Sequence, residues 1–239
     1  MEKLKRTAAL ALVLLMALSL CACGKSPLAG TWEGRMDISG QAAAWTEAAL
    51  EGLAPAAAGG EELPELSDYL GDFGFGYIIV FSEDGSFSAG PEEGELAACL
   101  ESLGESVKEY YRQYMFQALC RTAEDMGLGG DIDSVQQLEQ LMGVSMEEAV
   151  SQVLGMDLDA LAETLREGLR AKLAGLELEG RYEAGDGELL LSSGPEAAPS
   201  EGSRLGYVLE GDRLSLREDG GASLFSLEGI SLPELRRAS

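Results

Sequence analysis

Three short turns rich in Asp and Gly constrain the fold of this 239-residue chain more than any other feature. Each turn lies between two strand-like runs, and in most of them apolar and polar side chains alternate with the period of a β-strand. Asp and Gly favour tight hairpin loops because both accept the positive φ that such loops require. The three turns are Asp84-Gly85, Asp186-Gly187 and Gly211-Asp212. The sequence therefore predicts a series of antiparallel hairpins.

The register of two hairpins follows from their turns. A two-residue loop at the third turn places Tyr207 opposite Leu216, and the same loop at the second turn places Tyr182 opposite Leu191. Because successive side chains alternate between the faces of a strand, these apolar pairs indicate a sheet with one face in the core. The run Tyr77–Ser82 is apolar on both faces. We expect helices to cover its second face.

Helical spacing of apolar residues dominates the middle of the chain, from about residue 92 to 175. Ser145 and Glu148 form a capping-box pattern there, and leucines recur every three or four residues from Leu158 to Leu173. A helix is also expected over 42–53. Counting one more strand from the ending, Ser223–Leu227 and then Ile230 to Arg237, we predict seven or eight antiparallel strands. The predicted fold is an α+β up-and-down barrel or half-barrel, with the helical insertion between strands 3 and 4.

The first two dozen residues have the pattern of an export signal. Basic residues precede an apolar run, Ala8 to Leu18, that is too short to span a bilayer comfortably. The run ends in Leu20-Cys21-Ala22-Cys23-Gly24, which resembles the lipobox of bacterial lipoproteins. That resemblance implies removal of residues 1–22 as a signal peptide. It also implies that acyl chains such as palmitate are attached through the sulfur of Cys23.

Lipidation at Cys23 predicts a protein held at the outer side of a bacterial cell membrane. Each buried methylene contributes about 0.8 kcal/mol, and an anchor of at least two chains holds stably. Residues 23–29 would be a short tether with a reach of about 20 Å, so the folded part lies close to its membrane. Cleavage before Cys21, an uncleaved anchor and ordinary secretion are the alternatives.

A second resemblance concerns the first strand. The stretch Leu28-Ala29-Gly30-Thr31-Trp32-Glu33-Gly34 is similar to the Gly-x-Trp signature of lipocalins and of lipocalin-like lipoproteins. It implies that residues 30–239 form a single lipocalin-like domain, although the long helical insertion departs from that family. It also implies that Trp32 packs across the closed end of a barrel, with Arg236 or Arg237 stacked on it. The candidate pocket or barrel-closing residues are Trp32, Tyr77, Phe81, Tyr182 and Tyr207.

Composition excludes several classes of function. The chain contains no histidine, which removes Ser-His and Cys-His nucleophiles, histidine bases and most transition-metal sites. A net charge of −25 argues against nucleic acid and against docking on anionic lipid. It favours a solvated surface, or else an acidic face for a cationic ligand. We predict no metal or cofactor, because Asp131-Ile-Asp133 and Asp157-Leu-Asp159 lack the Gly and Glu of a calcium loop and fit helix caps better.

Other noteworthy side chains favour packing. Cys99 and Cys120 would lie about 31 Å apart on one continuous helix, whereas a disulfide needs Cα atoms within about 7 Å. We therefore expect free thiols unless that helix breaks. Trp45 and the tyrosines of residues 110–114 fit core packing, with a pocket or a partner surface as the alternative.

These patterns leave three hypotheses of function. The first is a non-enzymatic, membrane-tethered lipoprotein that binds a small hydrophobic ligand or a peptide in its barrel. The second is an envelope structural or protein-interaction lipoprotein that uses its helical insertion to contact a membrane-proximal protein. The third is an acid-catalysed hydrolase, which needs two facing carboxyl groups with separated pKa values.

Overall fold

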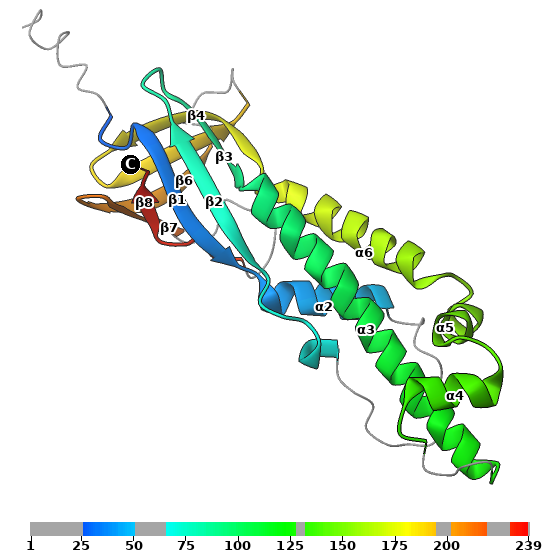
Figure 1. Cartoon of the computed structure of the whole chain (residues 1–239). Coiled ribbons are helices and arrows are strands. Elements are labelled where there is room, and N and C mark those ends of the chain that lie inside the picture. The colour runs from blue at the N-terminus through cyan, green and yellow to red at the C-terminus, as the bar shows by residue number, and fades with distance from the viewer. Residues whose placement is uncertain (1–25, 51–65, 128–131, 195–201, 219–229, 239) are drawn as a thin grey trace, which may run out of the picture.

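The computed structural model describes residues 26–50, 66–127, 132–194, 202–218 and 230–238. The predicted signal peptide, 1–22, and the predicted lipidation site, Cys23, lie outside these residues. Figure 1 shows an elongated molecule. A β-barrel forms one end of the molecule, and the helices run from the barrel to the opposite end.

Eight antiparallel strands form a closed up-and-down barrel in the described part of the chain. Each strand pairs with its neighbours in sequence, and β1 pairs with β8 to close the ring. The predicted fold class is confirmed, and the barrel is complete rather than half-open. The strands are β1 (Gly30–Asp37), β2 (Gly74–Phe81), β3 (Ser86–Pro91), β4 (Leu178–Gly185), β5 (Glu188–Ser193), β6 (Ser203–Glu210), β7 (Arg213–Glu218) and β8 (Leu235–Arg237).

The predicted hairpin registers are confirmed. Tyr207 lies opposite Leu216, and Tyr182 lies opposite Leu191. The second turn has positive φ at both residues, 53° at Asp186 and 80° in the glycine that follows, as a type I′ loop requires. Local turn chemistry therefore accounts for the pairing of β4 with β5 and of β6 with β7.

The long helical insertion lies between β3 and β4, as predicted. Its first helix contains 33 residues, which gives a length of about 50 Å at about 1.5 Å per residue. The insertion consists of α3 (Glu93–Asp125), α4 (Val135–Met142), α5 (Met146–Leu154), α6 (Leu158–Leu173) and the short 3-10 helix η2 (Ala174–Leu176). A further helix, α2 (Ser39–Leu50), and the 3-10 helix η1 (Leu66–Asp68) join β1 to β2. We call helices α2 to α6 the helical arm.

Side-chain caps begin four of these helices, and that of α3 is Glu92. Ser145 Oγ accepts a hydrogen bond from the backbone N–H of Glu148, at 3.2 Å, which bears out the capping pattern. Asp157 Oδ1 accepts from the backbone N–H of Ala160 at 2.6 Å, so this aspartate caps α6 as expected. The cap of α4 is Ser134, one residue after the aspartate that we had considered.

The interior of the barrel is filled by side chains. The inward-facing residues of all eight strands belong to one apolar cluster, which matches the capacity of an eight-stranded barrel. Helical residues complete this cluster at the end from which the arm leaves: Leu96, Leu100, Leu103, Leu169, Leu173 and Leu176. A second cluster lies inside the arm and includes Val107, Tyr111, Leu138, Val150 and Leu161.

The second face of β2 differs from its prediction. Ile78 and Val80 are only half-buried, and they line an open groove on the outer surface of the barrel together with Pro91. Helix α3 contacts β2 at its other end, where Glu95 Oε2 accepts from the backbone N–H of Gly76 at 2.7 Å. The helices fail to cover this face because the arm extends away from the barrel rather than along its side (Figure 1).

Trp32 closes the end of the barrel at which β1 begins. Its side chain is fully buried, and its Nε1–H donates to the backbone oxygen of Leu28 at 2.7 Å. The guanidinium of Arg237 lies 4.6 Å from the centre of the indole ring and donates to the oxygens of Ala29 and Pro27, at 2.9 and 2.8 Å. Of the two arginines considered, Arg237 is therefore the stacking residue.

The two described cysteines are free thiols, as predicted. Both belong to α3, which continues unbroken past Gly104. A Cβ built on Gly104 would lie 3.5 Å from the Cβ of Ala162 in α6, in van der Waals contact, so α3 and α6 cross closely at this glycine.

Replacing Arg237 with Ala should destabilise the barrel. The substitution removes a cation–π contact and two hydrogen bonds to backbone oxygens, which predicts a loss of about 1–2 kcal/mol in the free energy of unfolding. Urea denaturation measures this quantity, with Trp32 fluorescence as the signal. The matched control is Arg236→Ala, since Arg236 is exposed on the same strand. Equal destabilisation by the two variants would contradict the assigned stacking.

Candidate ligand-binding groove

The five aromatic residues proposed from the sequence lie in the barrel core. Four of them are at most 6% exposed, and Tyr207 is half-buried against the same cluster. Their polar groups bond to backbone: Tyr77 Oη donates to the oxygen of Leu176 at 2.8 Å, and Tyr182 Oη donates to that of Ser82 at 3.0 Å. Trp32 closes the barrel, and the other four fill it. None of the five lines the grooves described below.

An apolar groove lies instead in the helical arm, between α2 and α6. It has a volume of about 260 Å³, slightly below the range of about 300–1,000 Å³ typical of small-molecule sites. Its walls come from one face of each helix and from the turn before α6. The lining residues are Trp45, Thr46, Ala49, Met156, Leu161, Thr164, Leu165, Gly168, Leu169 and Lys172.

Gly168 leaves the space in the α6 wall. A glycine inside a helix costs about 1 kcal/mol relative to alanine, so its presence calls for a structural reason. At Gly104 the reason is the crossing with α6, but a Cβ on Gly168 would meet no atom within 4 Å. Packing therefore does not demand this glycine. Gly168 lines the groove, and no side chain projects from this part of the α6 wall.

The α2 wall is shallow because this helix carries small residues. Ala49 is exposed, and Trp45 is half-buried against the edge of the barrel core. The two threonines satisfy their hydroxyl groups within their own helices: Thr46 Oγ1 donates to the oxygen of Ala42 at 2.7 Å, and Thr164 Oγ1 donates to that of Ala160 at 2.8 Å. The surface left for a ligand is therefore almost entirely apolar.

Lys172 is the one charged residue that lines the groove. Its Nζ lies 5.6 Å from the centre of the Trp45 ring, within the range of a cation–π interaction. The residue belongs to the last turn of α6, near the barrel. The groove thus has an apolar length and one cationic end.

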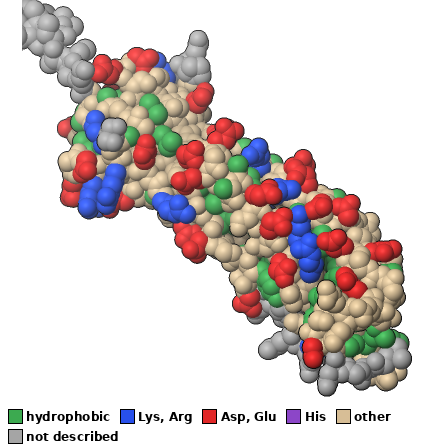
Figure 2. Space-filling model, viewed as in Figure 1, with side chains coloured by type: hydrophobic (Ala, Val, Ile, Leu, Met, Phe, Trp, Pro, Cys, Tyr) green, Lys and Arg blue, Asp and Glu red, His purple; other side chains and the backbone are tan. Residues whose placement is uncertain are grey.

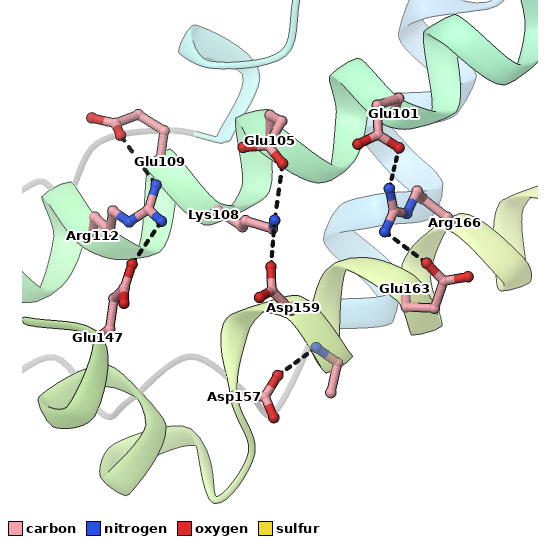
Figure 3. A network of polar contacts seen from close by, with 11 residues as sticks. Glu101, Glu105, Lys108, Glu109, Arg112, Glu147, Asp157, Asp159, Glu163 and Arg166 are labelled. Carbon is pink, nitrogen blue, oxygen red and sulfur yellow. Dashed lines mark hydrogen bonds and ion pairs between the residues drawn. The ribbon is translucent and has the colours of Figure 1, made fainter.

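Ion pairs join α6 to α3 on the side of α6 that faces away from the groove (Figure 3). Lys108 Nζ lies 2.9 Å from Glu105 and 2.5 Å from Asp159, the second of which belongs to α6. Lys108 lowers the pKa of Asp159 by hydrogen bonding to its carboxylate, and this carboxylate in turn raises the pKa of Lys108. At about 100° per residue, Asp159 faces away from Gly168.

Two further cations repeat this arrangement. Arg166 bridges Glu101 of α3 and Glu163 of its own helix, and Arg112 of α3 reaches Glu147 of α5 at 3.2 Å. An exposed ion pair contributes little by itself, typically below about 1 kcal/mol. Lys108 and Arg166 nevertheless join α6 to α3 at two points, and Arg112 joins α3 to α5. The α6 wall of the groove is therefore well supported.

The remaining recesses are weaker candidates for a ligand-binding site. A pocket of about 20 Å³ between Ser39 and Leu103 is too small for an organic ligand. A wide recess next to Tyr110 and Tyr111 is open to solvent. Tyr111 and Tyr114 are almost completely buried, and burial raises the pKa of Tyr111 to about 12. The tyrosine cluster thus has the packing role predicted for it.

Charged groups in the described residues offer no support for acid catalysis or metal binding. No three acidic or cysteine side chains are arranged there to hold a metal ion. The three aspartates with a shifted pKa are all lowered: Ser39 lowers the pKa of Asp37, Ser86 lowers that of Asp84, and Lys108 lowers that of Asp159. A general acid needs the opposite shift.

Comparison with protein families, curated proteins and solved structures finds no match to this chain. None of the described helices has both the length and the apolar character needed to cross a membrane. Of the residues that line the groove, sequence analysis had considered only Trp45 as a pocket residue. The available signal for the others was Gly168, a glycine in the middle of a leucine-rich amphipathic helix.

Adding a side chain at Gly168 should leave the fold intact. We expect Gly168→Leu to raise the free energy of unfolding by up to about 1 kcal/mol, because the helix gains propensity and the side chain enters open space. The matched variant Gly104→Leu should lower it by about 1–3 kcal/mol, because its side chain collides with α6. Urea denaturation of both variants tests this contrast, and a destabilised Gly168→Leu would mean that the groove is closed in solution.

Proposed function

We propose that this chain is a membrane-tethered, extracytoplasmic lipoprotein that binds a small apolar ligand in the α2–α6 groove. The observation that carries the proposal is a supported apolar groove, kept open by a glycine with no packing role. In this proposal the barrel is a filled base, and the ligand binds to the arm without being chemically changed.

The topology supports a tether at the closed end of the barrel. The described chain enters β1 beside Trp32, and the tight turn of Asp186 lies at that same end because β4 runs away from the helices. The arm leaves from the opposite end, after Asp37 and after Pro91. A lipid on Cys23 would therefore hold the barrel at the membrane and direct the arm outward.

Because the barrel is filled, we place the ligand site in the α2–α6 groove and not inside the barrel. Lipocalin-like binding requires space among the inward-facing side chains, but Phe75, Tyr77 and Phe81 are at most 2% exposed and pack in one cluster. The mouth of the barrel is closed by Leu173 and Leu176 from the arm. The groove on the arm offers the apolar surface that the interior does not.

A second candidate function is docking of a protein partner at the far end of the arm. Large apolar side chains are exposed there, including Met126 at 62%, Val153 at 51% and Leu141 at 46%. The described residues 132–159 contain acidic residues but no lysine or arginine. A basic, apolar surface on a partner would complement this region. Figure 2 shows that acidic side chains are spread over both barrel and arm.

The proposed groove can be tested with a neutral apolar fluorophore, N-phenyl-1-naphthylamine. We expect saturable binding of one molecule per chain, with energy transfer from Trp45. Gly168→Leu should abolish both, because its side chain occupies the groove. The control Gly40→Leu adds the same side chain at an exposed glycine of α2 that has equally open surroundings. Absence of binding to the native protein, or full binding to Gly168→Leu, would overturn the proposal.

The tether predicts a specific lipid attachment. When the full chain is expressed in a bacterium fed an alkyne-tagged fatty acid, label should appear on the protein and the protein should sediment with membranes. Cys23→Ser should lose both properties. Cys21→Ser should keep them, because the lipobox resemblance places cleavage after residue 22. Labelling that follows Cys21 instead would move the cleavage site, and unlabelled secreted protein would refute the anchor.

A further inference from the structure

We infer that the α2–α6 groove selects a ligand with one anionic head group on a single alkyl chain, specifically a medium-chain carboxylate. This inference rests on the proposed function and specifies its ligand. Lys172 would hold the carboxylate, and the apolar wall from Leu169 to Met156 would hold the chain.

Lys172 differs from the other arm cations described above. Lys108, Arg112 and Arg166 each bridge two carboxylates, so their charge is already neutralised. Among the described residues, no carboxylate lies within ion-pair distance of Lys172, whose described neighbour is the face of Trp45. An ammonium on an aromatic ring at the end of an apolar groove can still accept an anion.

The other side chains that line the groove offer few polar contacts. The hydroxyl groups of Thr46 and Thr164 each donate a hydrogen bond to a backbone oxygen of their own helix. A ligand with several polar groups would leave most of them without partners, which is costly when they lose water. One charged head and an otherwise apolar body match the distribution of groups along the walls.

The length of the groove suits a medium chain. Eleven residues of α6 separate Leu161 from Lys172, which corresponds to about 16 Å at about 1.5 Å per residue. An extended ten-carbon chain measures about 12 Å with C–C bonds of about 1.5 Å.

The net charge of −25 sharpens this selectivity. The field of the whole chain repels anions in general, so an anion without an apolar tail gains too little to bind. A cationic amphiphile is attracted to the acidic surface but meets the ammonium of Lys172 inside the groove. An anionic head that reaches Lys172 while its chain fills the groove offsets this repulsion with an ion pair, whereas a neutral head is not repelled but forms no ion pair.

The experiment compares decanoate, decanol and decylammonium at low salt and below their micellar concentrations. Each is titrated against bound N-phenyl-1-naphthylamine, and binding to Gly168→Leu is subtracted. The native protein should prefer decanoate over decanol by about three- to fivefold, the range of an exposed ion pair. Lys172→Met should remove this preference with decanol affinity unchanged, and Lys172→Glu should favour decylammonium. The control Arg170→Met changes an exposed cation that does not line the groove and should behave as the native protein.

Orientation provides a second readout. Because Trp45 lies at the Lys172 end, 2-bromodecanoate should quench its fluorescence more than 10-bromodecanoate does. Equal affinities for decanoate and decanol, or stronger quenching by the 10-bromo isomer, would overturn the head-group assignment and leave the groove itself intact. Failure of all three decyl probes to displace bound N-phenyl-1-naphthylamine would also overturn this inference, whereas the proposed function fails only if N-phenyl-1-naphthylamine itself does not bind.

Discussion

The barrel and the arm share one apolar core, and this shared packing positions every other feature. Leu173 and Leu176 continue α6 into the mouth of the barrel, where they meet the inward-facing side chains of β2. The hydroxyl of Tyr77 fixes this junction by donating to the backbone oxygen of Leu176. Helix α2 leaves from the same end of the barrel, directly after β1, and packs beside α6. The groove is a consequence of that arrangement.

Charge is arranged around α6 in a way that allows an apolar groove in a strongly acidic chain. One face of the helix carries Asp159, Glu163 and Arg166, which take part in the ion pairs with α3. The opposite face carries Gly168 and Lys172. The carboxylates on the first face are paired with cations, and no acidic side chain lines the groove. Its electrostatic character is then decided by one lysine.

Sequence reasoning succeeded where structure is local and failed where it depends on how elements cross. The pairing of Tyr182 with Leu191 follows from a two-residue turn and the twofold period of a strand. The apolar second face of β2 gave no indication that Ile78 would remain half exposed, because a pattern cannot tell which element covers a strand. Likewise, the role of Gly168 depends on the distance between α2 and α6. No local pattern contains that distance.

The groove also lies across the boundary between the two cores of the molecule. Leu169 belongs to the barrel cluster, whereas Leu161 and Leu165 belong to the arm cluster. An alkyl chain that lies along α6 therefore contacts both clusters at once, from Leu161 at one end to Leu169 near the other. Ligands that bind only the folded arrangement stabilise it by mass action. A bound chain would thus strengthen the joint between the base and the arm, and occupancy would be linked to how firmly the arm is held.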